Sequence, residues 1–138
     1  YREALQSAQL RPVQANVRFC SDAYQSGYDA ALALLGQRPN LTALFVSNDL
    51  PALGVLNAVA ALGLRVPEDI SVVSITDIEL ASQTRPALTT VAIPSAEMAE
   101  QGIDLLLKLI EQAPDAPQVI RSRDPVLVTR ASTAPPRA

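Results

Sequence analysis

The chain contains no histidine, and its glycines form none of the patterns that bind phosphate groups. Without histidine, catalysis by a serine–histidine or cysteine–histidine pair is excluded, and so is a metal site built on imidazole. The 5 glycines are not spaced as a P-loop or as a dinucleotide-binding fingerprint. We therefore expect no cofactor, no metal and no enzymatic activity.

Cysteine, basic clusters and long apolar runs are also scarce. The single cysteine, Cys20, excludes an internal disulfide, and because no base or cation stands beside it we expect a small buried apolar residue rather than a nucleophile. The 11 basic residues are outnumbered by 14 acidic ones and form no cluster, so this segment alone is not expected to bind DNA. No apolar run approaches the ~20 residues that span a bilayer. We expect no membrane contact and a cytoplasmic location.

Short apolar runs alternate with helical patterns over the first two thirds of the sequence. Residues 41–46 and 70–75 are predicted strands, each followed by a polar turn, and residues 50–64 between them predict a helix without charged side chains. Upstream, the patterns predict a helix end, a strand and a helix at residues 1–10, 13–19 and 24–35. This alternation predicts an α/β fold, with a parallel, doubly wound sheet and helices on both faces.

The pattern changes after residue 86. Residues 88–93 predict an extended segment, and a helix begins at Pro94 and Ser95. Apolar residues in that helix recur at the spacing i, i+3, i+4 and i+7, at Ile103, Leu106, Leu107 and Ile110. We expect this helix to pack by that one face. The remaining predicted parts are a proline-rich connector, a short strand and a loose tail, at residues 112–118, 126–128 and 132–138.

Polar side chains follow the two central predicted strands. Asn48 and Asp49 come after the first strand, and Thr76 and Asp77 come after the second. Small ligands bind at the carboxyl ends of strands in open α/β sheets, and amide and carboxylate groups can replace the water around ligand hydroxyls. The alternative is structural. Asn48 or Asp49 can cap the following helix, and for Asp49 we favour a cap or another structural role. Asp77 can serve turn chemistry.

The helix at residues 50–64 is uncharged on all sides. One face is sufficient to cover a sheet, and it comprises Ala52, Val55, Leu56, Val59 and Leu62. The opposite face comprises Leu50, Leu53, Gly54, Asn57 and Ala61. Because a helix that is apolar all round is buried all round, either another part of the chain or a second copy covers this second face. We favour a homodimer, since monomers rarely expose such patches.

Three motifs occur along the second half of the chain. VPEDISVV is followed by PALTTV, and the chain closes with STAPP. In this order they resemble the lactose/galactose-repressor family of bacterial transcriptional regulators. The resemblance covers nearly the whole chain, but only the second half of the family's effector-binding region. The chain opens at Tyr1 without an initiator methionine, so we expect a fragment from which the DNA-binding headpiece and the first subdomain are missing.

The resemblance implies a periplasmic-binding-protein-like fold of type I, in which two α/β subdomains enclose the ligand. Residues 1–86 and 117–132 would then belong to the carboxyl-side subdomain. Residues 87–116 would return to the amino-side subdomain, and residues 133–138 would form a tail. Since that second subdomain would lack most of its sheet, its helix is expected to repack or to swap between copies.

The resemblance also implies ligand contacts at Asn48, Asp77, Thr76 and Asp22. Asn48 matches an asparagine that holds effector hydroxyls, and Asp77 follows as the usual acidic neighbour. Thr76 departs from the aspartate of many members and cannot be a strong charged acceptor. Asp22 stands where members often have a stacking aromatic residue, for which Phe19 and Tyr24 are nearby substitutes.

The family's dimer contacts match Leu53, Leu56 and Asn57 together with residues 81–86, and the helix pattern adds Leu50. The sequence thus predicts the effector-sensing and dimerisation domain of a repressor, with a sugar or sugar-like effector and a homodimeric partner, which reaches DNA only through a missing headpiece. The alternative is a solute-binding protein of a sugar transporter. An enzyme on a flavodoxin-like scaffold is the least favoured class, because its candidate acid or base groups are only Asp22, Asp49 and Asp77.

Overall fold

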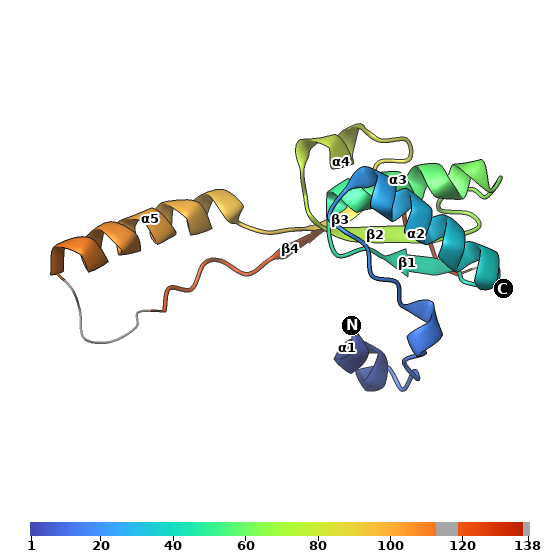
Figure 1. Ribbon diagram of the computed structural model, residues 1–138, viewed down its shortest axis with the longest axis horizontal. Coiled ribbons are helices and arrows are strands. Elements are labelled where there is room, and N and C mark those ends of the chain that lie inside the picture. The colour runs from blue at the N-terminus through green and yellow to red at the C-terminus, as the bar shows by residue number, and fades with distance from the viewer. Residues whose placement is uncertain (113–118, 137–138) are drawn as a thin grey trace.

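The computed structural model describes residues 1–112 and 119–136 (Figure 1). Their elements in chain order are α1 (Arg2–Ser7), the 3₁₀ helix η1 (Gln14–Asn16), α2 (Tyr24–Gln37), β1 (Ala43–Phe45), α3 (Asp49–Ala61), β2 (Ser71–Thr76), α4 (Glu79–Gln83), β3 (Thr89–Ala92), α5 (Ser95–Gln112) and β4 (Val126–Val128). The α/β class is therefore confirmed. Most of the predicted connector lies outside the described residues.

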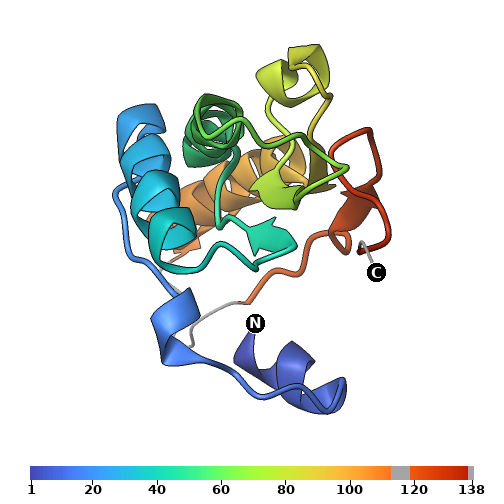
Figure 2. The same ribbon diagram turned by 90° about the vertical axis from the view of Figure 1, so that its right-hand side faces the viewer.

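The strands form one four-stranded sheet in the order β1-β2-β3-β4. β1 pairs with β2 and β2 with β3 in parallel, as predicted, with α3 and α4 in the crossovers. β4 pairs with β3 antiparallel, so the sheet is mostly parallel with one antiparallel edge strand, whose direction the sequence did not predict. Figure 2 shows α2 and α3 on one side of the sheet, and α1 and η1 on the other side.

The strand predicted at residues 13–19 is not formed. The backbone N–H groups of Asn16 and Val17 donate to the carbonyls of Val13 and Gln14, at 3.0 and 3.1 Å, so this stretch closes on itself as η1. Within the described residues no strand pairs with it. A run of alternating apolar and polar residues becomes a strand only where a neighbouring strand offers hydrogen bonds. The sequence pattern did not reveal that residues 13–19 have no such neighbour among the described strands.

α3 is the centre of the core, and α2 covers much of its second face. The two helices approach closely at two glycines: a Cβ on Gly27 would lie 2.1 Å from the Pro51 carbonyl oxygen, and one on Gly54 would lie 2.0 Å from the Tyr24 carbonyl oxygen. Of the 13 residues of α3, eight are buried. The chain itself therefore covers part of the face that the sequence assigned to a partner, including Gly54.

Two features after β2 differ from the sequence-based expectations. α4 is a short helix that the sequence pattern did not predict. The tail expected to be loose from residue 132 instead begins with a fully buried Ser132. Its hydroxyl donates to the Val72 carbonyl at 2.6 Å and accepts from the Thr89 N–H at 2.8 Å. Ser132 thereby joins β2 and β3 where both strands begin.

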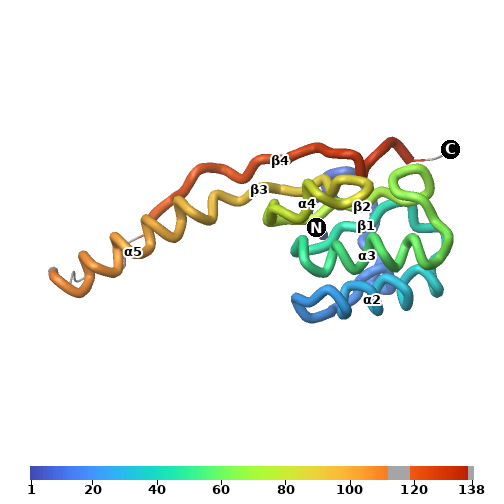
Figure 3. Tube along the Cα trace, turned by 90° about the horizontal axis from the view of Figure 1, so that it is seen from above, coloured from blue at the N-terminus to red at the C-terminus, as the bar shows by residue number. Residues whose placement is uncertain are grey.

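The helix α5 leaves the body of the molecule. Figure 1 and Figure 3 show it projecting beside the segment that leads back to β4. Its predicted start at Ser95 is confirmed. Its apolar stripe is exposed, with Ile103 at 60% and Ile110 at 71% of full accessibility. The expected packing of this face is thus not provided by the residues that the structure describes.

Candidate functional site

The carboxyl ends of β1 and β2 lie next to each other at one edge of the sheet. Ala43 is paired with Ser71 and Phe45 with Val73, so the two strands run in the same direction and in register. Asn48 follows the first strand, Thr76 ends the second, and Asp77 comes directly after it. Parallel pairing therefore places the two predicted polar loops at the same edge of the sheet.

Asn48 is the N-cap of α3 and also contacts a second predicted site residue. Its Oδ1 accepts a hydrogen bond from the Leu50 N–H at 3.1 Å, so the capping interpretation is confirmed. Its Nδ2 donates to Oδ2 of Asp22 at 2.9 Å. Asp22 is exposed and lies just before α2. The structure thus joins Asn48 and Asp22 into one polar pair, with a second amide hydrogen of Asn48 left over for another acceptor.

Asp49 is fully buried and accepts three hydrogen bonds. Its Oδ1 accepts from the hydroxyls of Ser74 and of Thr90, the latter at 2.7 Å, and its Oδ2 accepts from the Ile78 N–H at 2.8 Å. A buried carboxylate is stable only when its oxygens are satisfied in this way. The structural role favoured for Asp49 is therefore confirmed, although Asn48 rather than Asp49 is the cap.

Thr76 and Asp77 have an unusual backbone conformation. Their φ angles are +128° and +58°, a region that side-chain-bearing residues avoid. Oγ1 of Thr76 and Oδ1 of Asp77 are buried without a hydrogen-bond partner among the described residues. Strained backbone and unsatisfied polar atoms both have a free-energy cost, and they concentrate where proteins bind ligands.

Arg130 neutralises Asp77. Its Nη2 lies 2.7 Å from Oδ1 of Asp77, so this oxygen has a charged partner in an ion pair. Arg130 is itself held by the Leu88 carbonyl at 2.8 Å and by Oγ1 of Thr89 at 2.9 Å. Sequence reasoning missed Arg130. The available signal was a single arginine shortly after the last predicted strand, which is too common to be noticed.

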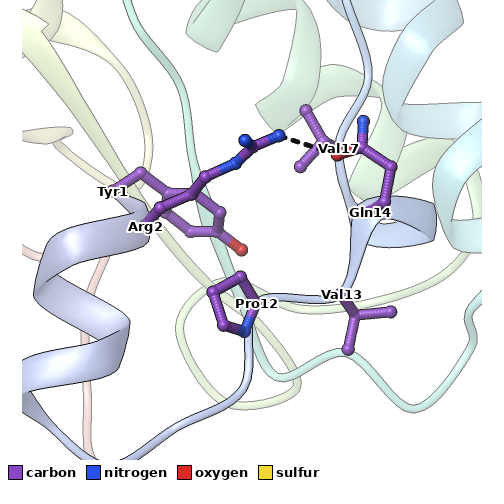
Figure 4. A pocket seen from close by; sticks show the side chains of 6 residues that line it. All are labelled: Tyr1, Arg2, Pro12, Val13, Gln14 and Val17. Atoms are coloured by element: carbon purple, nitrogen blue, oxygen red, sulfur yellow. Dashed lines mark hydrogen bonds between the residues drawn. The ribbon is translucent and has the colours of Figure 1, made fainter.

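Neither of two hollows on the described residues encloses the predicted ligand contacts. The larger one, of about 360 Å³, lies between β1 and the segment at residues 16–20, and it reaches Ser47 beside Asn48. Phe19, 91% exposed, lies at its wall. Cys20 beside it is also exposed, so the expectation that it is buried is wrong. The smaller one, of about 280 Å³, is shown in Figure 4, where Arg2 donates a hydrogen bond to Gln14 at 2.8 Å.

Two ion pairs away from this edge change the pKa of a side chain. The hydrogen bond from Arg123 lowers the pKa of Glu97, at the start of α5. The hydrogen bond to Asp69 raises the pKa of Arg65 above its ordinary value. The first pair joins α5 to the segment that returns to β4, and so ties together the two chain segments that leave the body.

The described residues contain no group of three metal-binding side chains of the histidine, cysteine, aspartate or glutamate type. None of the helices in residues 1–112 and 119–136 has the length and apolarity required to cross a membrane.

Comparison with known proteins identifies the family. A family model described as a periplasmic binding protein-like domain matches residues 1–133. The HTH-type transcriptional repressor PurR of Edwardsiella ictaluri (strain 93-146) is 35% identical over 134 residues, which are 97% of this chain and 39% of that repressor. PurR of Yersinia enterocolitica (serotype O:8 / biotype 1B) is 39% identical over 110 residues, 80% of this chain and 32% of the repressor.

Solved structures of regulators have the same fold. The complex of the transcriptional regulator CelR with cellobiose has a TM-score of 0.90 and 33% identity, over 96% of this chain and 40% of CelR. A LacI family transcriptional regulator from Mycobacterium smegmatis has a TM-score of 0.90 and 35% identity, over 99% of this chain and 51% of that regulator. The chain spans less than half the length of the curated relatives it matches.

The chain therefore belongs to the periplasmic binding protein-like domain family. Within that class, the relatives and the solved structures place it among the LacI-family regulators, as part of their effector-binding domain. This agrees with the family that the motifs VPEDISVV, PALTTV and STAPP indicated.

Proposed function

We propose that this chain is the effector-sensing and dimerisation part of a transcriptional repressor, and that its effector is a sugar or sugar-like molecule. The relatives are named as transcriptional repressors, which favours a regulator over the solute-binding protein of a transporter and over an enzyme. One neighbouring regulator is a complex with cellobiose, one from Enterococcus faecium has bound ribose, and one from Arthrobacter is a complex with lactose. The intact protein would bind DNA in the cytoplasm through a headpiece outside residues 1–138.

The observation that carries this proposal is the pairing of two polar loops at one edge of the sheet. The first loop contributes the Asn48–Asp22 pair, and the second contributes the unpaired Oγ1 of Thr76 and the carboxylate of Asp77, which is paired with Arg130. A polyhydroxylated ligand supplies both donors and acceptors, so it can complete the hydrogen bonding of these groups. Arg130 offsets the charge of Asp77, which makes this edge better suited to a neutral ligand than to a cation.

We also propose that one end of α3 contributes to a homodimer interface. Leu50 is 40% exposed, Leu53 is partly buried, and Asn57 is exposed and donates from Nδ2 to the Leu53 carbonyl at 3.1 Å. Leu56 lies in the core beneath this surface and would support it from below. A second copy related by a two-fold axis would bury the same residues on both chains.

Thermal-shift measurements on the full-length protein test the sensing function. We expect cellobiose, lactose or ribose to raise the melting temperature, because a ligand that binds only the folded state stabilises it. Asn48→Ser retains an N-cap of equal quality but loses the amide, so it should weaken the binding of that sugar about tenfold. Asn40→Ser, at an exposed turn before β1, is the matched control and should not change affinity. Equal affinity in both variants would exclude Asn48 from the site.

A further inference from the structure

Asp49 is the one buried acidic side chain among the described residues, and the proposed ligand contacts do not include it. It is the first residue of α3, directly after Asn48. A carboxylate at this depth is expensive to bury, and a helix start requires only a cap, which Asn48 already supplies. Capping therefore does not explain the charge of Asp49.

Asp49 contacts residues on both sides of the strained loop formed by Thr76 and Asp77. Ser74 lies two residues before Thr76, and Ile78 lies directly after Asp77. The Ser74 hydroxyl donates to one carboxylate oxygen of Asp49 and the Ile78 N–H donates to the other, so a single side chain holds both ends of the loop. Between them lie the two residues with positive φ.

The same carboxylate fixes this loop relative to its neighbours. Asp49 is joined through the backbone to Asn48, and through Oδ1 to Thr90 of β3. The strain at Thr76 and Asp77 can persist only where surrounding contacts over-determine the conformation. The three charge-assisted hydrogen bonds that Asp49 accepts are contacts that can hold Thr76 and Asp77 in this conformation.

We propose that Asp49 is a positioning residue for the effector site: it holds Thr76 and Asp77 in the left-handed conformation and at a fixed distance from Asn48. This inference rests on the proposed sensing function. The effect of Asp49 on the conformation of Thr76 and Asp77 can nevertheless be measured without a ligand. Asp49 itself contacts no effector, since both of its oxygens are turned inward and occupied.

Hydrogen exchange by mass spectrometry on the full-length protein tests the loop geometry directly. Asp49→Ala should increase the exchange of the amides at residues 76–78 about tenfold, because it releases the Ile78 N–H. Asp49→Asn should restore most of the protection, since its amide oxygen can accept from Ile78 while its NH₂ donates to the two hydroxyls. If Asp49→Ala does not fold, Ser74→Ala gives a milder form of the same test.

Ser132→Ala is the matched control. It also removes two buried hydrogen bonds between β2 and β3, but at the opposite ends of these strands. We expect it to lower the melting temperature without a specific increase of exchange at residues 76–78. Unchanged exchange at this loop in the Asp49 and Ser74 variants, or the same uniform increase in these variants and in Ser132→Ala, would overturn the positioning role.

The sugar probes of the thermal-shift test then separate the two proposals. Where cellobiose, lactose or ribose binds the wild type, Asp49→Ala should weaken it at least about tenfold, Asp49→Asn less so, and Ser132→Ala not at all. If the wild type binds none of the three sugars, the proposed effector class fails, and the exchange at residues 76–78 still decides the role of Asp49.

Discussion

The helices α3 and α5 are both rich in apolar side chains, but their surroundings differ. α3 has one charged residue, Asp49, and packs against α2 and β2, so that Val59 and Ala52 are fully buried. α5 carries charges along one side and an apolar stripe along the other, and none of its described side chains is buried. The periodicity thus identified which face of each helix is apolar. It did not identify what covers that face, because covering is a property of distant segments.

The largest expected effect in this comparison concerns glycine. Gly54→Ala places a methyl group against the backbone of α2, where Tyr24 cannot yield without moving the helix, so we expect a loss of about 3 kcal/mol in the free energy of unfolding. Gly102→Ala in α5 has no atom within 4 Å of its new Cβ and should stabilise the helix by about 1 kcal/mol. Urea denaturation measures both. A similar loss at the two positions would contradict the close contact between α2 and α3.

The second largest difference between α3 and α5 is expected in the stability lost when a buried or an exposed apolar side chain is truncated. Val59→Ala removes fully buried methyl groups and should cost about 2 kcal/mol of stability, whereas Ile103→Ala in the chain of residues 1–138 should cost less than about 0.5 kcal/mol. Thermal unfolding followed by circular dichroism checks this difference. If Ile103→Ala costs as much as Val59→Ala, another surface covers the stripe of α5.

A smaller effect concerns the exposed end of α3. Leu53→Asp would introduce an unpaired charge into the proposed dimer interface and should raise the dimer dissociation constant at least about tenfold. Leu62→Asp, at the exposed C-cap of the same helix, is the control and should leave the dissociation constant unchanged. Sedimentation equilibrium gives both constants. If Leu53→Asp leaves the dimer dissociation constant unchanged, α3 is not part of the interface.

The smallest effect is expected at the base of α5. Because Arg123 lowers the pKa of Glu97, this pair contributes stability above the ordinary pKa of the glutamate, and the contribution is lost as the pH falls through the lowered pKa. Melting temperatures of the wild type and of Arg123→Gln should therefore differ slightly at neutral pH and converge in acid. A difference that grows as the pH falls would have the wrong sign for this pair.

Local patterns predicted most of the fold. The helix at residues 24–35 and the strand at residues 70–75 were placed within two residues of α2 and β2, since their periodicity is visible within a short window. The strand predicted at residues 13–19 was wrong and the antiparallel direction of β4 was not predicted, because strands depend on partners far along the chain. Ser132 was missed for the same reason, since a serine in a proline-rich end gives no sign of burial.

The candidate site was predicted less completely. The polar residues after the two strands could be named from the sequence, because parallel strands end at a common edge. The bond between Asn48 and Asp22 joins residues 26 positions apart and could not be inferred from spacing. The ion pair of Asp77 with Arg130 and the strain at Thr76 are likewise properties of the folded chain.

The buried position of Ser132 also bears on how this domain is made. The starts of β2 and β3 have hydrogen-bonding groups, at Val72 and Thr89, whose partner is a residue synthesised much later. A nascent chain that has not yet released Ser132 from the ribosome can form α2 and α3 but must leave these groups to water. Completion of the sheet therefore waits until the segment that carries Ser132 has been synthesised, and truncation shortly before Ser132 would leave the starts of β2 and β3 open and prone to aggregation.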